Sequence, residues 1–344
     1  MTAATSLLEH PDLLADKIAF LSHAEAYGAD TTKVEVIETH MSMVFLTDRF
    51  VYKLKKPVWF EFLDFSTLEA RHQFCLKEVR VNHPLAGDTY MGVVPLTFDQ
   101  GHFQLNGEGR VVEWIVKMKR LPRNLMLHEA IRDGMVPKEW AQLVAEKLVT
   151  FYLTEVPVDE GSLRFRNNII QDVELNSAAL LNRHFKLSIS LVVGITTDLL
   201  LFIIKHADLF ERRVRTGRII DAHGDLRPEH ICLGPDPVII DRIEFNKDLR
   251  IMDVAEELSF FALECEMLSA PDIGQLFLHV YQRKGHDAIP GELIHFYKAK
   301  RAFLRARLSI EHLREKKYAA SPKKWTDRCD MYLRAASSHC KHLI

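Results

Sequence analysis

The sequence contains few cysteines, and they follow neither a metal-binding nor a disulfide pattern. Its 344 residues include five cysteines, and no two of them form a CxxC pair. An odd and scattered set of this kind is typical of a reducing compartment and argues against a zinc site. We therefore expect a cytoplasmic protein.

An excess of charge of one sign is also missing. Lysine and arginine together number 45 and aspartate and glutamate 47, which gives a formal net charge of -2. A nucleic-acid-binding protein usually carries a basic surplus on one face. The sequence therefore predicts no nucleic-acid partner.

The sequence lacks an uninterrupted hydrophobic run. Residues 1–17 carry acidic side chains where a signal peptide would need a basic segment and a continuous apolar one. The apolar run at 187–204 has the length of a membrane span, but serine, threonine and aspartate interrupt it. We expect this run to form parts of one or two buried helices, and we expect no membrane partner.

The motif GxxxxGK[ST] is absent as well. In P-loop proteins that motif forms a glycine-rich loop whose backbone amides hold nucleotide phosphates. Its absence excludes a P-loop ATPase.

What is present is an ordinary globular composition whose pattern changes along the chain. Hydrophobic residues make up 47% and charged residues 27%. A helical rhythm at 5–28 gives way to short β-branched and aromatic runs that continue to about 118, with one helix from about 66. After 121–122 the pattern is helical, except for a β-like island at 231–245.

Strands and helices in separate blocks predict an α+β fold with two lobes. We place the first lobe at 1–120, with the helix at 5–28 leading it, and the second, helical lobe at 121–344. A chain of this length usually exceeds what one hydrophobic core fills, which also favours two lobes.

The segment HGDLRPEH at 223–230, followed by VIID at 238–241, is the most informative part of the sequence. Phosphoryl transfer needs a carboxylate beside the attacking hydroxyl, a ligand for Mg²⁺ and a cation on the nucleotide phosphates. Asp225 lies in a predicted loop, and Asp241 ends an apolar run. A β-hairpin beginning at 231 would bring these two carboxylates close together at the opening of one site.

These segments resemble the Brenner-type motif of aminoglycoside phosphotransferase-like and choline-kinase-like enzymes, in which HGD replaces the HRD of protein kinases. The stretches IETHMSMVFLTDRFVYKLKKPV, FLDFSTLEARHQFCLKEVRVN and VEWIVKMKRLP are similar to a bacterial subgroup of that family without a settled substrate. The resemblance extends from about 34 to about 264. It implies a bilobal protein-kinase-like fold, with an antiparallel β N-lobe that carries one main helix and a mostly helical C-lobe.

The resemblance also implies roles for single residues. Asp225 would be the catalytic base or would orient the acceptor hydroxyl, Asp241 would bind Mg²⁺, and His223 would hold the loop backbone. The cofactors would be ATP and Mg²⁺, and the acceptor a hydroxyl of a small molecule. A turn-forming aspartate at 225 and a strand-end cap at 241 are the structural alternatives.

His230 departs from the family pattern, which carries asparagine five residues after the catalytic aspartate. An amide oxygen suits Mg²⁺, whereas an imidazole nitrogen suits transition metals better. Three consequences stay open: a mechanism with one metal ion, a different divalent ion, or nucleotide binding without catalysis. In the first case His230 would donate to a phosphate oxygen or to Asp225.

A kinase-like nucleotide site also needs a lysine on the third strand and a glutamate on the adjoining helix. Lys53 is favoured over Lys55, because the residue two before it shares its strand face and is the apolar Val51, suited to adenine. The alternative is a solvated edge-strand lysine cluster. Glu78 is favoured over Glu69, because an acid in the first turn of a helix is explained by the helix dipole alone.

Three further residues complete the predicted arrangement. Backbone amides of the turn at 39–43, with the Ser42 hydroxyl, would contact the phosphates, and an ordinary β-turn is the alternative. Met118 would shape the adenine pocket or simply fill the core. Asp253 would support the catalytic loop or cap the following helix. That helix carries acids that would attract a cationic acceptor or form a solvated face, at 256, 257, 264 and 266.

Three functions follow from these predictions. The first is a small-molecule kinase, and the second is a protein kinase. The second is disfavoured, because the segment between Asp241 and Asp253 leaves no room for an activation segment ending in APE. The third is a nucleotide-binding pseudokinase, which the histidine at 230 keeps open.

Overall fold

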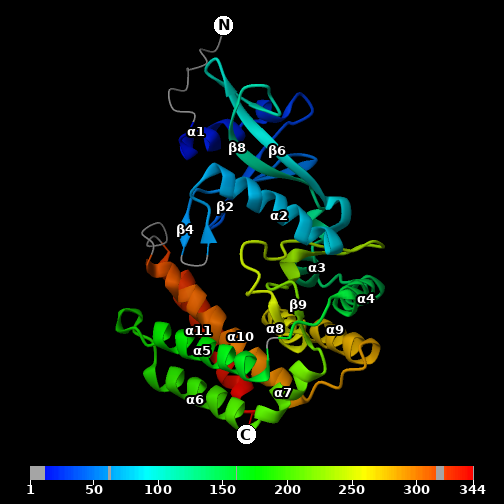
Figure 1. Cartoon of the computed structure of the whole chain (residues 1–344), viewed down its shortest axis with the longest axis vertical. Coiled ribbons are helices and arrows are strands. Elements are labelled where there is room, and N and C mark those ends of the chain that lie inside the picture. Colours follow the sequence, from blue (N-terminus) through cyan, green and yellow to red (C-terminus); the bar gives the residue numbers. More distant parts are fainter. Residues whose placement is uncertain (1–11, 61–62, 160, 315–320, 344) are drawn as a thin grey trace. The chain divides into compact units, whose positions relative to one another are not determined.

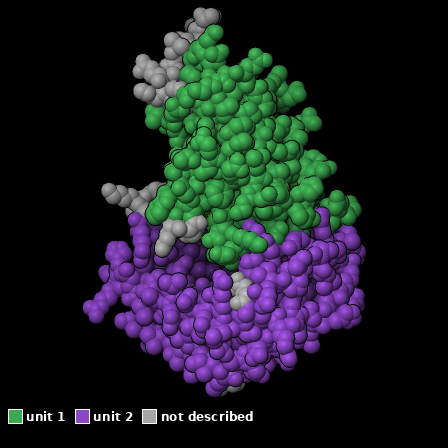
Figure 2. Space-filling model, in the orientation of Figure 1, with its two compact units in different colours: residues 1–129, 230–249 green, residues 130–229, 250–344 purple. Residues whose placement is uncertain are grey.

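The structure, a computed structural model, describes residues 12–60, 63–159, 161–314 and 321–343. The chain forms two compact units, one from residues 1–129 and 230–249 and the other from residues 130–229 and 250–344 (Figure 2). The sequence pattern divided the chain once, at 120/121. The two compact units instead alternate along the sequence, because the segment 230–249 packs with the first unit.

A six-stranded antiparallel sheet dominates the first unit, in the order β1-β2-β3-β8-β6-β7 (Figure 1). The strands of the first unit are β1 (Glu35–Glu38), β2 (Ser42–Leu46), β3 (Phe50–Lys55), β4 (Trp59–Phe60), β5 (Leu63–Asp64), β6 (Tyr90–Asp99), β7 (His102–Leu105), β8 (Arg110–Lys119), β10 (Ile231–Cys232) and β11 (Val238–Ile239). Its helices are α1 (Leu14–Leu21), η1 (Ala24–Tyr27), α2 (Leu68–Ala86), η2 (Gly87–Thr89) and η3 (Arg123–Leu125). The predicted antiparallel N-lobe sheet with one main helix is confirmed.

Alternation along β3 separates two cores, one on each face of the sheet. Tyr52 and Leu54 join an apolar cluster with Leu21 of α1. Val51 packs on the opposite face, against a cluster that includes Cys75 of α2. Because side chains alternate along a strand, Lys53 and Lys55 share the face of Val51 and lie on the α2 side.

The two helices of this unit follow from local signals. Thr67 caps α2, since its hydroxyl accepts a hydrogen bond from the amide of Ala70 at 3.1 Å. The leading helix predicted at 5–28 is α1 followed by the 3₁₀ turn η1 in the described part of the chain, and residues 1–11 lie outside the described residues. As expected, α1 packs on the sheet, through Leu14, Ile18 and Leu21.

The second unit is mostly helical, as predicted. Its elements are α4 (Lys138–Thr154), α5 (Ser162–Leu180), η4 (Arg183–Phe185), α6 (Ile189–Lys205), α7 (Ala207–Arg215), β9 (Ile219–Asp221), β12 (Ile251–Asp253), α8 (Val254–Met267), α9 (Pro271–Lys284), α10 (Gly291–Glu311), η6 (His312–Arg314) and α11 (Pro322–Cys340). Two short elements lie across the boundaries between the units, α3 (Leu127–Arg132) and η5 (Pro228–His230).

Short strands flank the HGD motif on both sides in the sequence. The hairpin predicted to begin at 231 is present, with β10 paired antiparallel to β11. The pair β9–β12 was not predicted, because three-residue strands are too short to show an alternating pattern.

The apolar run at 187–204 belongs to one helix, α6, which buries one side of its surface. Among the described residues, no single helix has both the length and the apolar character needed to cross a membrane. Helices α6 and α7 together reach that length and composition, but the chain bends by 64° between them.

Candidate active site

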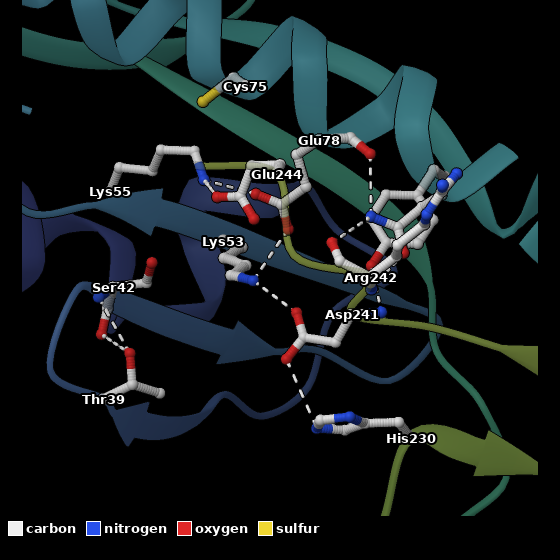
Figure 3. Close-up of polar contacts among 12 residues, drawn as sticks. Thr39, Ser42, Lys53, Lys55, Cys75, Glu78, His230, Asp241, Arg242 and Glu244 are labelled. Carbon is white, nitrogen blue, oxygen red and sulfur yellow. Dashed lines mark hydrogen bonds and ion pairs between the residues drawn. The ribbon is translucent and has the colours of Figure 1, made fainter. Parts of the chain in front are cut away.

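Lys53, Glu78 and Asp241 meet on the α2 face of the sheet in the first unit. Lys53 Nζ lies 2.8 Å from Glu78 Oε1 and 2.8 Å from Asp241 Oδ1 (Figure 3). The glutamate side chain is fully buried, whereas 15% of the lysine side chain and 45% of the aspartate side chain are exposed. Three residues predicted from distant parts of the sequence thus form one cluster, and Asp241 is its member most open to solvent.

The electrostatics of this cluster keep Lys53 and Glu78 charged. Burial by itself would lower the pKa of Lys53, but the carboxylates of Asp241 and Glu78 outweigh it and hold that pKa well above its usual value. Burial acts to raise the pKa of Glu78, yet the ammonium groups of Lys53 and Lys55 hold it below its usual value. At neutral pH the cluster therefore presents a fixed ammonium beside a half-exposed carboxylate.

A second lysine shares the same glutamate. Lys55 Nζ lies 2.6 Å from Glu78 Oε2 and also donates to Glu244 Oε1. Lys53 and Lys55 were predicted as alternatives, but their two-residue spacing on one strand lets both reach Glu78. Glu244 was missed. The available signal was its place in the largely apolar segment VIIDRIEF at 238–245, because an acid that is buried with such a segment needs a partner.

The backbone at Asp241 adopts a conformation that residues other than glycine seldom take. Its φ is +66°, in the left-handed region, which aspartate tolerates better than most residues. The Asp241 amide donates to the Tyr90 hydroxyl at 3.1 Å, and the next amide, of Arg242, donates to Asn82 Oδ1 at 2.8 Å. Asn82 lies on α2, one turn after Glu78, so the same helix fixes the glutamate and the chain that follows Asp241.

His230 faces the second oxygen of Asp241. Its Nε2 atom lies 3.7 Å from Asp241 Oδ2, and 8% of its side chain is exposed. The Ile240 amide donates to the His230 carbonyl at 2.9 Å, which keeps the two segments together. The predicted partners of His230 were a metal, a phosphate or Asp225. Within the first unit, Asp241 is a neighbour of this imidazole.

Apolar side chains lie on the same face as Lys53. Val51 pairs with Met118 of β8 in the register of the two strands. Met118 is 9% exposed and belongs to the buried cluster, which agrees with its alternative assignment as a core residue. Val51, Val238 and Ile240 are partly buried against that cluster, so they retain the apolar surface that an adenine ring would need.

The turn between β1 and β2 satisfies its own polar groups. The Thr39 amide and hydroxyl donate to the Ser42 carbonyl at 2.9 and 3.0 Å. The Ser42 amide donates to the Thr39 hydroxyl at 2.9 Å, and Ser42 is 3% exposed (Figure 3). These hydrogen bonds close the turn, and Ser42 takes no part in the function proposed below.

A buried carboxylate holds the HGD loop (residues 222–227) in the second unit. Glu257 of α8 accepts hydrogen bonds from the backbone amides of His223 at 3.1 Å and Gly224 at 2.6 Å, and from the Tyr152 hydroxyl at 2.7 Å. Glu257 is 0% exposed, and burial raises its pKa. The His223 ring accepts at Nδ1 from the Asp225 amide at 3.4 Å, so the histidine orders the loop backbone. Sequence reasoning missed the role of Glu257.

Asp225 is the most exposed residue of the HGD loop, with 31% of its side chain exposed. Arg227 Nε lies 3.1 Å from Asp225 Oδ2, and Arg227 Nη1 lies 2.7 Å from Glu229 Oε1. The guanidinium of Arg227 thus orients the carboxylates of both Asp225 and Glu229. The first unit holds Lys53, Asp241 and their neighbours, and the second unit holds Asp225.

Asp253 caps α8, which is one of its two predicted roles. Its Oδ1 accepts from the Ala255 amide at 2.8 Å, and Arg213 binds both its oxygens at 2.7 and 2.8 Å. The carboxylate that contacts the HGD loop is instead Glu257, one turn further along the helix.

The prediction of a solvated acidic face on α8 is wrong for three of its four acids, whereas Glu266 is partly exposed, with 25% of its side chain open to solvent, and pairs with His339 at 3.1 Å. Glu256, Glu257 and Glu264 are all buried. Each has a partner inside the second unit: Glu256 binds Lys300 at 2.9 Å, and Glu264 accepts from the Tyr332 hydroxyl at 2.8 Å. Because these acids are used within the fold, they give no evidence for a cationic acceptor.

The residues around Asp241 fit a magnesium–nucleotide complex. In nucleotide sites Mg²⁺ is usually bound through one or two carboxylates together with the phosphates. Asp241 offers one half-exposed carboxylate, and Lys53 places an ammonium beside it for the phosphates. The nearby nitrogen of His230 is a poor ligand for Mg²⁺, so the donor set suits a single ion on Asp241.

Comparison with known proteins adds sequence relatives without a described activity. No protein-family profile matches the chain. An uncharacterised protein of Mycobacterium tuberculosis and one of Mycobacterium bovis are each 28% identical to it over 291 residues, covering 81% of this chain and 55% of the relative. The chain thus spans about half the length of the curated relatives it matches.

Solved structures identify the fold. A choline/ethanolamine kinase family protein of Mesorhizobium loti has a TM-score of 0.52 with 13% identity, over 96% of this chain and 99% of that chain. The choline kinase LicA of Streptococcus pneumoniae has a TM-score of 0.51 with 13% identity, over 93% of this chain and 99% of that chain. The chain has the kinase-like fold of these proteins, as the sequence predicted.

Proposed function

We propose that the chain is an ATP-dependent phosphotransferase that acts on a hydroxyl group of a small molecule. The observation that carries the proposal is the double contact of Lys53 with Glu78 and Asp241. A buried glutamate holds an ammonium beside a half-exposed carboxylate, which supplies the cation and the metal ligand that phosphoryl transfer needs at the nucleotide. The kinase-like fold supports the same conclusion.

On the nucleotide side, each residue has one task. Lys53 would turn from Asp241 toward the phosphates, while Glu78 keeps its hold on the ammonium. Asp241 would hold Mg²⁺, which when bound adds positive charge to the phosphates. Val51 would contact the adenine ring, since it lies two residues before Lys53 on the same strand face.

On the acceptor side, Asp225 would accept the proton of the attacking hydroxyl. The acceptor oxygen forms a bond to the γ-phosphorus while the bond to the bridging oxygen breaks, and ADP leaves. Arg227 and the buried Glu257 keep the carboxylate and its loop in place before the reaction. Little of the catalysis is covalent, so this positioning is the main contribution of the protein.

The experiment is a transfer assay with purified protein, ATP and a panel of hydroxyl compounds. Choline and ethanolamine head the panel, because proteins of similar fold are named for them. We expect ADP release that depends on one acceptor, together with a phosphorylated product identified by mass spectrometry. Absence of ATP binding in calorimetry, with or without Mg²⁺, would refute the proposal.

A second candidate function is nucleotide binding without transfer, and the position of His230 favours it. The imidazole faces Asp241 Oδ2, where a second oxygen ligand for metal would be useful. The transfer assay separates the two functions when it is run with Mg²⁺ and with Mn²⁺. Transfer with Mg²⁺ alone excludes the second candidate, whereas ATP binding without transfer to any acceptor supports it.

A further inference from the structure

The first unit contains a second lysine–glutamate pair that the proposed chemistry does not use. We propose that Lys55 and Glu244 are positioning residues. They allow Glu78 to keep its contact with Lys53, and they connect the segment that carries Asp241 to Glu78. This inference rests on the proposed function and extends it to residues that touch neither nucleotide nor acceptor.

Burial separates this pair from the site proper. Lys55 is 0% and Glu244 6% exposed, whereas the Lys53 and Asp241 side chains both reach solvent. The Lys55 ammonium lies 5.0 Å from the centre of the Phe65 ring, on an apolar side of the cluster. An ammonium so enclosed is placed to act on its neighbours and not on a ligand.

The division of charge among the four residues gives the pair its task. Glu78 has one carboxylate for two ammonium groups, with Oε1 on Lys53 and Oε2 on Lys55 (Figure 3). Glu244 supplies Lys55 with a carboxylate of its own. When Asp241 turns to a metal, two lysines and two glutamates remain in balance, and Glu78 can keep its hold on Lys53.

Without Glu244 this balance would be lost. A single buried carboxylate would then face two buried ammonium groups, and an uncompensated buried charge is costly. Lys55 is the more deeply buried lysine, so it would draw Glu78 away from Lys53. The consequence is a misplaced Lys53, although neither Lys53 nor Glu78 has changed.

Glu244 also anchors the backbone that carries Asp241. It lies three residues after Asp241, and Arg242 between them is bound to Asn82 of α2 at 2.8 Å. The Lys55 ammonium therefore joins three elements at one point: β3 through its own backbone, α2 through Glu78, and the segment after β11 through Glu244.

The test compares Glu244→Gln, the double variant Lys55→Met/Glu244→Gln and the wild type. Affinity for ATP with Mg²⁺ is measured by calorimetry, and the free energy of unfolding by urea denaturation. We expect Glu244→Gln to weaken ATP binding by about tenfold or more. We expect the double variant to recover to within about threefold of the wild type, because Glu78 then serves Lys53 alone and the bond from the Arg242 amide to Asn82 still ties the Asp241 segment to α2.

Glu113→Gln is the matched control. Glu113 is also buried and bridges two cations in the same unit, Arg71 at 2.8 Å and Lys17 at 3.1 Å, but it does not bind Lys53 in the structure. We expect it to lower the unfolding free energy as Glu244→Gln does and to leave ATP affinity within about twofold of the wild type. A loss of affinity equal to that of Glu244→Gln would reduce the effect to general destabilisation and overturn the proposal.

Two further outcomes would overturn it: wild-type affinity in Glu244→Gln, or a double variant that binds ATP as weakly as Glu244→Gln. If Glu244→Gln fails to fold, the double variant decides alone, because it leaves no charge of this pair uncompensated. In that case, a loss of ATP affinity of more than about tenfold in the double variant contradicts the proposal. Failure of the proposed function is distinguishable, since the wild type itself would then bind no ATP.

Discussion

Two regions of the molecule each place a buried glutamate behind a solvent-reaching aspartate, and they do so by different means. In the first unit Glu78 binds two ammonium groups, which hold its pKa low. In the second unit Glu257 binds backbone amides and a hydroxyl, and burial raises its pKa. The first arrangement aims side chains by charge, and the second shapes a loop by hydrogen bonds. Variants in the first should therefore change ligand binding, and variants in the second should change turnover and stability.

The largest expected effect separates the two regions at the aspartates themselves. Asp225→Asn should lower the rate of phosphate transfer by about 10³-fold, because an amide cannot accept the hydroxyl proton. Its affinity for ATP should stay within about threefold of the wild type, since the phosphates are bound by the metal and the lysine. Calorimetry and a transfer assay measure the two quantities. Asp208→Asn, in an exposed turn of α7, is the control.

Asp241→Ala should fail in the opposite way. Loss of the metal ligand should weaken ATP binding in the presence of Mg²⁺ by about 10- to 100-fold. Without Mg²⁺ the variant should bind ATP as well as the wild type or better, because Lys53 loses a competing carboxylate. If titrations with and without Mg²⁺ show the same defect as Asp225→Asn, the two roles are not separate.

The pH dependence of stability tests the arrangement of Glu257 and the HGD loop. A carboxyl group whose pKa is raised on folding contributes stability that is complete below its unfolded pKa, about 4.3, and is lost as pH rises through the folded value. The unfolding free energies of the wild type and Glu257→Gln should therefore converge as pH rises above about 4.

The neighbouring Glu256 provides the control with the opposite sign. Burial would raise its pKa, but Lys300 and Arg301 outweigh burial and hold that pKa below its usual value. Its contribution is present above the unfolded pKa and lost as pH falls, so the wild type and Glu256→Gln should diverge as pH rises. Urea denaturation at several pH values measures both pairs, and parallel curves for the two would contradict the account.

The smallest effect is expected at His230, which faces Asp241 but is not needed as a ligand for Mg²⁺. An amide oxygen suits Mg²⁺ better than an imidazole nitrogen does, so His230→Asn should keep transfer activity with Mg²⁺ within about threefold of the wild type or raise it. The measurement is the ratio of rates with Mg²⁺ and Mn²⁺. A wild type that prefers Mn²⁺, and a variant that loses this preference, would instead assign His230 to a metal.

The sequence predicted the fold well where local patterns are long. The strands at 42–55, the helix at Leu68–Ala86 and the helical second half show a period that burial on one side imposes. The contact of Lys53 with Glu78 could also be anticipated, because strand alternation and helix position leave few choices. Short strands such as β9 and β12 gave no such pattern.

What the sequence could not reveal are pairings between buried charges. Glu256 and Glu257 look like a solvated face, since nothing local shows that Lys300 and the HGD loop lie against them. Lys55 looked like a rejected candidate for a role that Lys53 already filled. Partners of this kind are set by tertiary packing, and burying a charge is tolerated only when such a partner is present.

The most direct test of the central claim compares two lysines of the same segment. Lys53 contacts Glu78 and Asp241, whereas Lys56, three residues later, is buried against Glu38 and the Thr39 carbonyl. Calorimetry with ATP and with adenosine should be run on Lys53→Met and Lys56→Met. The account predicts that Lys53→Met loses most of the advantage of ATP over adenosine, about tenfold or more, and that Lys56→Met keeps it. Equal preference for ATP in the two variants would contradict the assignment of Lys53 to the phosphates.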